Sequence, residues 1–154
     1  MKLKIILLFL LCIFANAQTL TGKVIGIKDG DTVVVIDAAN NQTTLRLAEV
    51  DCPEKKQAFG TKAKQFTSDA VYLKEVKYII TDTDRYGRSI AKVYYDDNKY
   101  LSAEIIKNGF GWQYKKYSTS TLLANLEQEA RQNKRGLWVD PNPIYPSVFR
   151  KNNK

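Results

Sequence analysis

Three short polar clusters contain the side chains that could do chemistry in this sequence. They are Asp29–Thr32 (DGDT), Arg46–Glu54 (RLAEVDCPE) and Asp84–Arg88 (DRYGR). Each cluster alone has an ordinary structural explanation, because DGDT is typical of a hairpin turn and charged residues are common in surface loops. Together they combine paired carboxylates with paired guanidinium groups, a combination that suits a hard metal ion and phosphate oxygens.

The candidate acids are Asp31, Asp51 and Glu54. Asp51 and Glu54 bracket Cys52-Pro53 just after a predicted strand, where the proline fixes the backbone. Hard cations such as Ca²⁺ or Mg²⁺ bind sets of oxygen ligands, and backbone carbonyls commonly complete these sets. We therefore take Asp31 and Asp51 as a candidate pair of metal ligands. The alternative for these acids is a solvated acidic turn.

The candidate cations come from two places. Arg46 stands in an otherwise apolar strand, and an arginine stays charged at any working pH, so it needs an enclosed anionic partner. Arg85, Tyr86 and Arg88 surround Gly87 in a turn that is rich in hydrogen-bond donors. Such a turn suits phosphate oxygens, because a guanidinium binds two of them at once. The alternative is a charged surface turn without a ligand.

The composition excludes most other kinds of catalytic site. The chain has 154 residues, 24 Lys+Arg, 16 Asp+Glu and no histidine, for a formal net charge of +8. This length is sufficient for one domain, and 44% hydrophobic residues are sufficient for a packed core. Without histidine, Ser-His-Asp triads, Cys-His nucleophiles and His-rich zinc sites are excluded. A basic chain with opposed arginines and acids therefore favours metal-assisted phosphodiester cleavage.

The first 17 residues are predicted to be a secretory signal peptide. They contain two lysines, an apolar run over Ile5–Phe14 and small residues up to Ala17, after which we expect cleavage. The run is shorter than the roughly 20 residues that span a bilayer, which disfavours a retained anchor, so no membrane association is expected after cleavage. Cys12 is removed with the predicted signal peptide, so Cys52 would be the only cysteine of the processed protein. The sequence thus predicts a secreted or periplasmic protein without an internal disulfide.

Hydrophobic periodicity predicts an α+β fold for the rest of the chain. The expected strands are Thr21–Ile27, Thr32–Ile36, Thr43–Val50, Val76–Thr81 and Ser89–Tyr95. The expected helices are Phe59–Leu73, Leu101–Ile106 and Thr121–Lys134, and the last should be closed by Gly136. Five short strands with helices inserted and appended favour a small closed β-barrel of the OB type.

We expect one domain over residues 18–140, followed by a basic, proline-containing tail over 141–154. Three prolines and the terminal run RKNNK make this tail poor in core-forming residues. It is expected to pack at most through Trp138, Tyr145 and Phe149.

These motifs resemble those of the secreted members of the staphylococcal nuclease (thermonuclease) family. Their order and spacing agree with the family over nearly all of the chain that follows the predicted cleavage site. The matching segments are Val24–Val33, Leu45–Glu54, Gln57–Ala63, Asp84–Ala91 and Arg135–Trp138. The resemblance implies an OB-fold barrel with three helices. It also implies a calcium-dependent nuclease that acts on DNA and RNA and leaves 3′-phosphate ends.

The resemblance also implies a role for each matching residue. Asp31, Asp51 and the main-chain carbonyl of Cys52 would bind Ca²⁺. Glu54 would be the general base or would orient the attacking water. Arg46 and Arg88 would hold the scissile phosphate and its transition state, and the nucleotide site would be lined by Arg85, Tyr86 and one or both of Tyr114 and Tyr117.

Two departures from the family pattern bear on calcium affinity and substrate preference. Cys52 stands where the best-known member has threonine, but a ligand that acts through its carbonyl does not depend on its side chain. The loop after Glu54 is shorter, and Ala58 replaces a proline that is common in relatives.

Three alternatives remain at this point. The first is an OB-fold module that binds nucleic acid without cutting it, although its acids would then repel phosphate. The second is a calcium-stabilised exported structural domain, which leaves Arg46 and Arg88 unexplained. The third is a Cys52 nucleophile, which has no histidine to activate it. We expect a monomer without an obligate protein partner.

Overall fold

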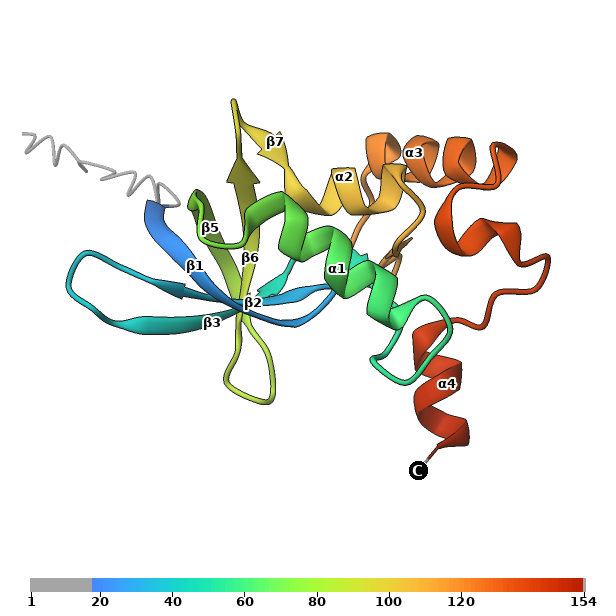
Figure 1. The fold of residues 1–154 in the computed structure, drawn as a ribbon, viewed down its shortest axis with the longest axis horizontal. Coiled ribbons are helices and arrows are strands. Elements are labelled where there is room, and N and C mark those ends of the chain that lie inside the picture. Colours follow the sequence, from blue (N-terminus) through green and yellow to red (C-terminus); the bar gives the residue numbers. More distant parts are fainter. Residues whose placement is uncertain (1–17, 154) are drawn as a thin grey trace, which may run out of the picture.

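A computed structural model describes residues 18–153 (Figure 1). The predicted signal peptide lies outside the described residues. Within them, no helix is both long and apolar enough to cross a membrane. The strands form one half of the molecule, and most of the helices lie beside and across them (Figure 1).

Five strands close into a mixed β-barrel, which confirms the predicted OB-type fold. The strand order is β3-β2-β1-β5-β6, and parallel pairing of β3 with β6 closes the barrel. All other neighbours in the barrel are antiparallel. The barrel strands are β1 (Thr19–Asp29), β2 (Thr32–Ile36), β3 (Gln42–Leu47), β5 (Glu75–Thr83) and β6 (Ser89–Tyr95).

Alternation along the strands decides which side chains fill the barrel. Val33 and Val35 of β2 and Leu45 and Leu47 of β3 are all buried, whereas the residues between them are less buried. Burial of such a side chain contributes roughly 1.5–3 kcal/mol. Arg46 lies between the two buried leucines and points to the other face of β3. The packing of β3 therefore orients the arginine.

All three predicted helices are present; the first two pack against the barrel and the third packs against the second, and three short strands lie before and between them. The helices are α1 (Gly60–Val71), α2 (Leu101–Lys107) and α3 (Thr121–Gln132). The Ser120 hydroxyl accepts a hydrogen bond from Leu123 N at 3.3 Å and caps α3, as the hydroxyl-rich segment before it predicts. The short strands are β4 (Val50–Asp51), β7 (Lys99–Tyr100) and β8 (Trp112–Gln113).

The third predicted strand is not continuous. It breaks at Glu49, whose φ of 67° lies in the left-handed region, and Val50–Asp51 continues as β4 and pairs with β8. The break is held by Ser102 Oγ, which donates to Ala48 O at 2.7 Å, and by Ser118 Oγ, which donates to the Glu49 carboxylate at 3.0 Å. Left-handed backbone costs about 1–2 kcal/mol at such a residue. These hydrogen bonds from distant elements offset the cost and could not be read from the local sequence.

The C-terminal part also differs from the prediction. Helix α3 ends at Gln132 rather than Lys134, and Gly136 begins the 3-10 helix η1 (Gly136–Val139) instead of closing α3. A Cβ on Gly136 would lie only 2.2 Å from Gly109 O, so this glycine is needed for close backbone contact. The tail contains a further helix, α4 (Pro146–Asn152), which the sequence analysis did not predict.

Candidate active site

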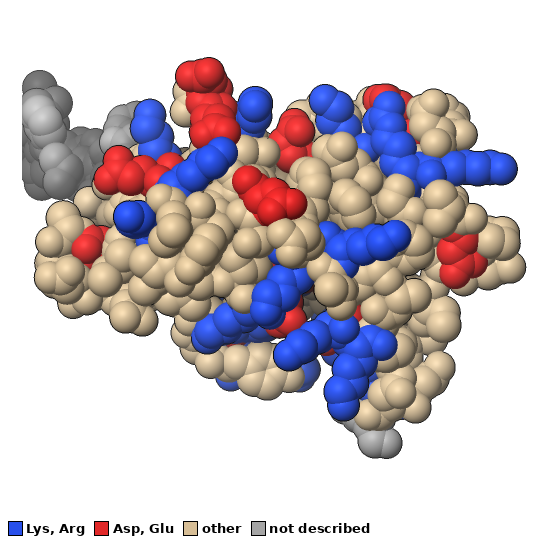
Figure 2. All heavy atoms as spheres, viewed as in Figure 1, with Lys and Arg blue, Asp and Glu red and all other residues tan. Residues whose placement is uncertain are grey.

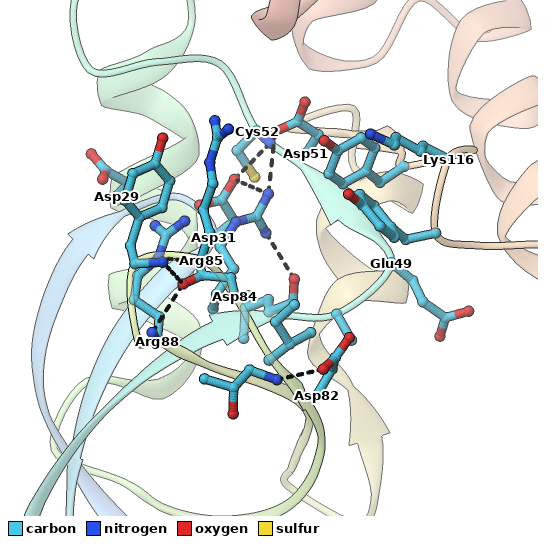
Figure 3. Close-up of a pocket in the computed structure, with 18 of the residues that line it drawn as sticks. Asp29, Asp31, Glu49, Asp51, Cys52, Asp82, Asp84, Arg85, Arg88 and Lys116 are labelled. Atoms are coloured by element: carbon cyan, nitrogen blue, oxygen red, sulfur yellow. Dashed lines mark hydrogen bonds and ion pairs between the residues drawn. The ribbon is translucent and has the colours of Figure 1, made fainter.

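One cavity of about 580 Å³ contains every residue that the sequence analysis proposed for the site (Figure 3). Asp31 lies in the turn between β1 and β2, Asp51 ends β4, and Cys52 and Glu54 lie between β4 and α1. The arginine-rich turn lies between β5 and β6, and the two tyrosines follow β8. The proposed residues that line the cavity are Asp31, Arg46, Asp51, Cys52, Glu54, Arg85, Tyr86, Arg88, Tyr114 and Tyr117.

Asp31 is fixed by the turn between β1 and β2. Its Oδ2 accepts a hydrogen bond from Cys52 N at 2.9 Å, and its backbone carbonyl accepts one from Leu47 N at 2.8 Å. Next to it, Gly30 O accepts a hydrogen bond from the Thr67 hydroxyl of α1 at 2.5 Å. A Cβ on Gly30 would lie 2.9 Å from the Ala63 Cβ, so α1 packs directly against this turn. The DGDT cluster is thus a turn, and it also carries a site residue.

Arg46 bridges the two aspartates that were expected to form a pair. Its Nη2 lies 3.3 Å from Asp31 Oδ2 and 3.2 Å from Asp51 Oδ1. Its Nη1 donates to Leu47 O at 2.8 Å and to Val50 O at 2.9 Å. The side chain is only 12% exposed, and burial alone would lower its pKa, but the two carboxylates raise it. The expected anionic partners of this buried guanidinium are therefore present, and they hold it in one orientation.

Asp51 has the most perturbed carboxyl of the site. Its pKa is raised from 3.8 to about 6, chiefly because burial disfavours the charge; Arg46 lowers it and Asp31 raises it further. The residue is only 1% exposed. Its Oδ2 is buried and makes no hydrogen bond within residues 18–153. A buried carboxylate oxygen without a donor is energetically unfavourable unless a cation compensates it.

The donor set fits a hard cation. Asp31 and Asp51 offer carboxylate oxygens, and the buried Oδ2 of Asp51 makes no hydrogen bond among the described residues, although the guanidinium of Arg150 lies 3.5 Å away. In the described part of the chain, no group of three or more acidic, thiol or imidazole side chains is close enough to hold a metal by itself. A cation here would therefore need main-chain oxygen or water as well, and the carbonyl of Cys52 is the candidate that the sequence supplies.

The side chain of Cys52 has no chemical role that the structure supports. Burial raises the pKa of its thiol well above the ordinary value, and the charge of Asp31 adds to this effect. The thiolate is the nucleophilic form of cysteine, so a thiol with a raised pKa is unreactive. The structure thus argues against a Cys52 nucleophile.

Arg85 and Arg88 line the cavity from the turn between β5 and β6 (Figure 3). Asp84 Oδ2 accepts a hydrogen bond from Arg88 Nε at 2.7 Å, and Asp84 Oδ1 accepts bonds from Arg88 N and Tyr86 N. Desolvation opposes the charge of Asp84, but these hydrogen bonds from Arg88 and Tyr86 lower its pKa. Within residues 18–153, Arg88 makes no other ion pair. Its Nη groups therefore remain for a ligand.

Three tyrosine rings line the cavity. The guanidinium groups of Arg85 and Arg88 lie 4.9 and 5.6 Å from the ring centre of Tyr86, which is 70% exposed. Tyr114 and Tyr117 contact each other edge to face, with ring centres 4.9 Å apart. Exposed rings beside cations suit stacking against nucleotide bases.

The structure adds one residue that the sequence analysis missed. Arg150 of α4 enters the cavity, where its Nη1 donates to Glu54 Oε1 at 2.5 Å and its Nη2 lies 3.5 Å from Asp51 Oδ2. The only signal in the sequence was the basic composition of the tail, which does not indicate a partner. Figure 2 shows Lys and Arg side chains gathered between the loop that joins β5 and β6 and helix α4, with acidic atoms visible between them.

Comparison with known proteins gives consistent results. The family model described as staphylococcal nuclease homologue matches residues 44–140. An "Uncharacterized endonuclease" of Haemophilus influenzae is 40% identical over 156 residues, which cover 98% of this chain and 87% of that protein. A "Micrococcal nuclease" of Shigella flexneri is 37% identical over 144 residues, which cover 86% of this chain and 82% of that protein.

A plant relative matches over a smaller part of its own length. The "Staphylococcal-like nuclease CAN1" of Arabidopsis thaliana is 36% identical over 110 residues, which cover 71% of this chain and 34% of that protein. Given these matches, the closed barrel and a cavity lined by both acids and arginines, this chain belongs to the staphylococcal nuclease family and is a nuclease.

Proposed function

We propose that this protein is an exported, calcium-dependent nuclease that hydrolyses DNA and RNA to products with 3′-phosphate ends. The observation that carries the proposal is the position of Arg46 between Asp31 and Asp51, in a cavity that also holds Arg88. A site that only bound nucleic acid would gain nothing from buried acids beside its cations.

The residues that would hold the cation are Asp31, Asp51 and the carbonyl of Cys52. A bound Ca²⁺ would supply positive charge that stabilises the negative charge developing on the phosphate. Calcium is proposed because it accepts irregular sets of carboxylate, carbonyl and water oxygens. The buried Oδ2 of Asp51 supports a cation at this position, because it makes no hydrogen bond among the described residues and its positive partner there, Arg150, is a partly exposed side chain 3.5 Å away.

Arg46 and Arg88 would stabilise the transition state directly. Attack of water on phosphorus adds negative charge to the non-bridging oxygens, and fixed guanidinium groups offset it without any reorganisation. Arg46 is held by two acids and two carbonyls, and Arg88 is held through its Nε, so both are preorganised. Glu54 would accept a proton from the water or orient it. The bond between phosphorus and the 5′ oxygen then breaks, the 5′ oxygen takes up a proton from solvent to become a hydroxyl, and the phosphate stays on the 3′ oxygen.

The first experiment is hydrolysis of single-stranded DNA and of RNA by the protein with Ca²⁺ and with a chelator. Glu54→Gln and Arg88→Ala are assayed beside the parent. We expect cleavage only with calcium, large losses in both variants, and fragments whose 3′ ends become extendable by a polymerase only after phosphatase treatment. Salt-sensitive binding without cleavage would replace this proposal by a non-catalytic nucleic-acid-binding module.

Export is proposed from the N-terminal sequence alone. Cell fractionation and N-terminal sequencing of the processed protein test it. A protein that begins at Gln18 in a periplasmic or culture fraction is expected, and an unprocessed protein in the cytoplasm would contradict export.

A further inference from the structure

Helix α4 is attached to the wall of the cavity by specific contacts. Ile144 O accepts a hydrogen bond from Gln57 Nε2 at 2.5 Å, and the Tyr145 ring lies 5.3 Å from the Trp112 ring. Pro146, the first residue of α4, is buried. These contacts place α4 beside the segment that precedes α1, as Figure 1 shows. The tail is therefore a part of the site and not a disordered appendage.

Arg150 extends a row of alternating charges across the cavity. Arg46 lies between Asp31 and Asp51, and Arg150 lies between Asp51 and Glu54. Arg150 contacts the Oδ2 of Asp51, whereas Arg46 contacts the Oδ1. The Arg150 side chain is 41% exposed, so its ion pairs are partly hydrated and are worth little in stability. Arg150 can thus leave the two acids at a small cost in free energy, although its contact with Glu54 is short.

The acids that hold Arg150 are also those that the proposed reaction uses. A divalent cation at Asp51 would repel the guanidinium, because two positive charges within a few ångströms are unfavourable in a partly buried site. Arg150 would then lie in a cavity lined by Arg46, Arg85 and Arg88, whose natural occupant is a phosphate group. The guanidinium of Arg150 would then exchange the carboxylate oxygens of Asp51 and Glu54 for the oxygens of a phosphate group.

We propose that Arg150 is a substrate-binding residue of this nuclease, which Glu54 and Asp51 hold in the free protein and which contacts a phosphate of the nucleic acid once substrate and cation are bound. This inference rests on the proposed function. It adds a phosphate contact from the C-terminal helix to those made by the barrel.

The test compares Arg150→Gln with Arg150→Lys and with the matched control Lys151→Gln. Lys151 is the next residue of α4 and is exposed, and it does not line the cavity, so its loss changes the net charge equally. We expect the KM of Arg150→Gln for single-stranded DNA to rise about tenfold, with kcat within about threefold of the parent. Arg150→Lys keeps the charge but cannot make a bidentate contact, so its KM should rise less than that of Arg150→Gln. Lys151→Gln should resemble the parent.

A second readout separates substrate contact from a merely structural role. Binding of single-stranded DNA in the presence of Ca²⁺ is measured against salt concentration in an Arg88→Ala background, in which cleavage is slow. Loss of one phosphate contact should reduce the slope of log affinity against log salt by about 0.7. A structural defect would lower the amount of active protein and leave this slope unchanged. Thermal unfolding checks that each variant is folded. If the Gln variant is not, the Lys variant is judged by its KM, which should exceed that of the parent with kcat within about threefold; a parental KM would overturn the inference.

The possible failures are distinguishable. If the parent does not cleave nucleic acid, the proposed function fails, and the salt slope still decides whether Arg150 contacts phosphate. If the parent cleaves and Arg150→Gln matches it in KM and in slope, the inference is overturned while the nuclease assignment stands. A variant that binds Ca²⁺ more tightly but has the parental KM and slope also overturns it, because Arg150 is then only a counter-ion of the acids.

Discussion

Replacement of Asp51 by asparagine should make the metal-free protein more stable at neutral pH. Asp51 is buried, and its Oδ2 makes no hydrogen bond within the described residues, so its charge is held at a cost. Asparagine has nearly the same shape and can still accept a hydrogen bond from Arg46. Arg46 also keeps its contacts with Asp31 and with two backbone carbonyls. The change therefore removes an unfavourable charge without leaving Arg46 unpaired. Arg150 loses one contact at 3.5 Å, but it is 41% exposed and keeps its ion pair with Glu54, so this loss is small.

The size of the effect comes from the pKa of Asp51. Burial is the main reason why this pKa rises from 3.8 to about 6. Because one pKa unit corresponds to about 1.4 kcal/mol, the charged form of Asp51 costs about 3 kcal/mol of folding free energy above the folded pKa. Between pH 3.8 and about 6, the folded protein holds a proton that the unfolded chain has lost, so raising the pH lowers the free energy of unfolding. Below this range both states are protonated and the cost disappears.

The assay is urea unfolding followed by tryptophan fluorescence in the presence of a chelator. At pH 8, Asp51→Asn should raise the free energy of unfolding by about 3 kcal/mol, and the gain should fall towards zero near pH 4. Asp84→Asn is the control of opposite sign, because the lowered pKa of Asp84 means that its charge stabilises the fold. With Ca²⁺ added, the parent should be stabilised and Asp51→Asn should not. A gain that is independent of pH, or a loss of stability at pH 8, would refute this reasoning.

The remaining predictions concern Arg46 and Arg88, the turn between β1 and β2, and the thiol of Cys52. Arg46→Ala or Arg88→Ala should reduce the rate of cleavage about a hundredfold, in line with loss of one preorganised donor, and activity within a few-fold of the parent would remove that residue from the mechanism. Thr67→Val removes the hydroxyl that donates to Gly30 O and should lower the free energy of unfolding by about 1–2 kcal/mol; an unchanged urea midpoint would show that this bond does not stabilise the turn. Cys52 should react with a thiol reagent only after unfolding, because it is buried and its pKa is raised, and rapid labelling of the folded protein would contradict this.

Local patterns were enough to predict the barrel. Alternating valines in Thr32–Ile36 and the apolar steps of α1 indicate their elements without reference to the rest of the chain. The break at Glu49 could not be predicted in the same way, since hydrogen bonds from Ser102 and Ser118 hold it. Nor could the end of α3, where Gly136 is required by contact with the backbone of Gly109.

The sequence by itself determined which residues of the barrel face the cavity. Each of these residues belongs to a short motif, and the order and spacing of the motifs place them at strand ends or in turns. Only the tertiary structure decided what surrounds them. The pKa of Asp51 depends on burial and on Arg46 and Asp31, which come from other elements. Arg150 meets Glu54 across 96 residues of chain because α4 docks beside the segment before α1. Charges and solvent exclusion act through space, so a linear pattern identifies the groups of a site but not the electrostatic environment that they share.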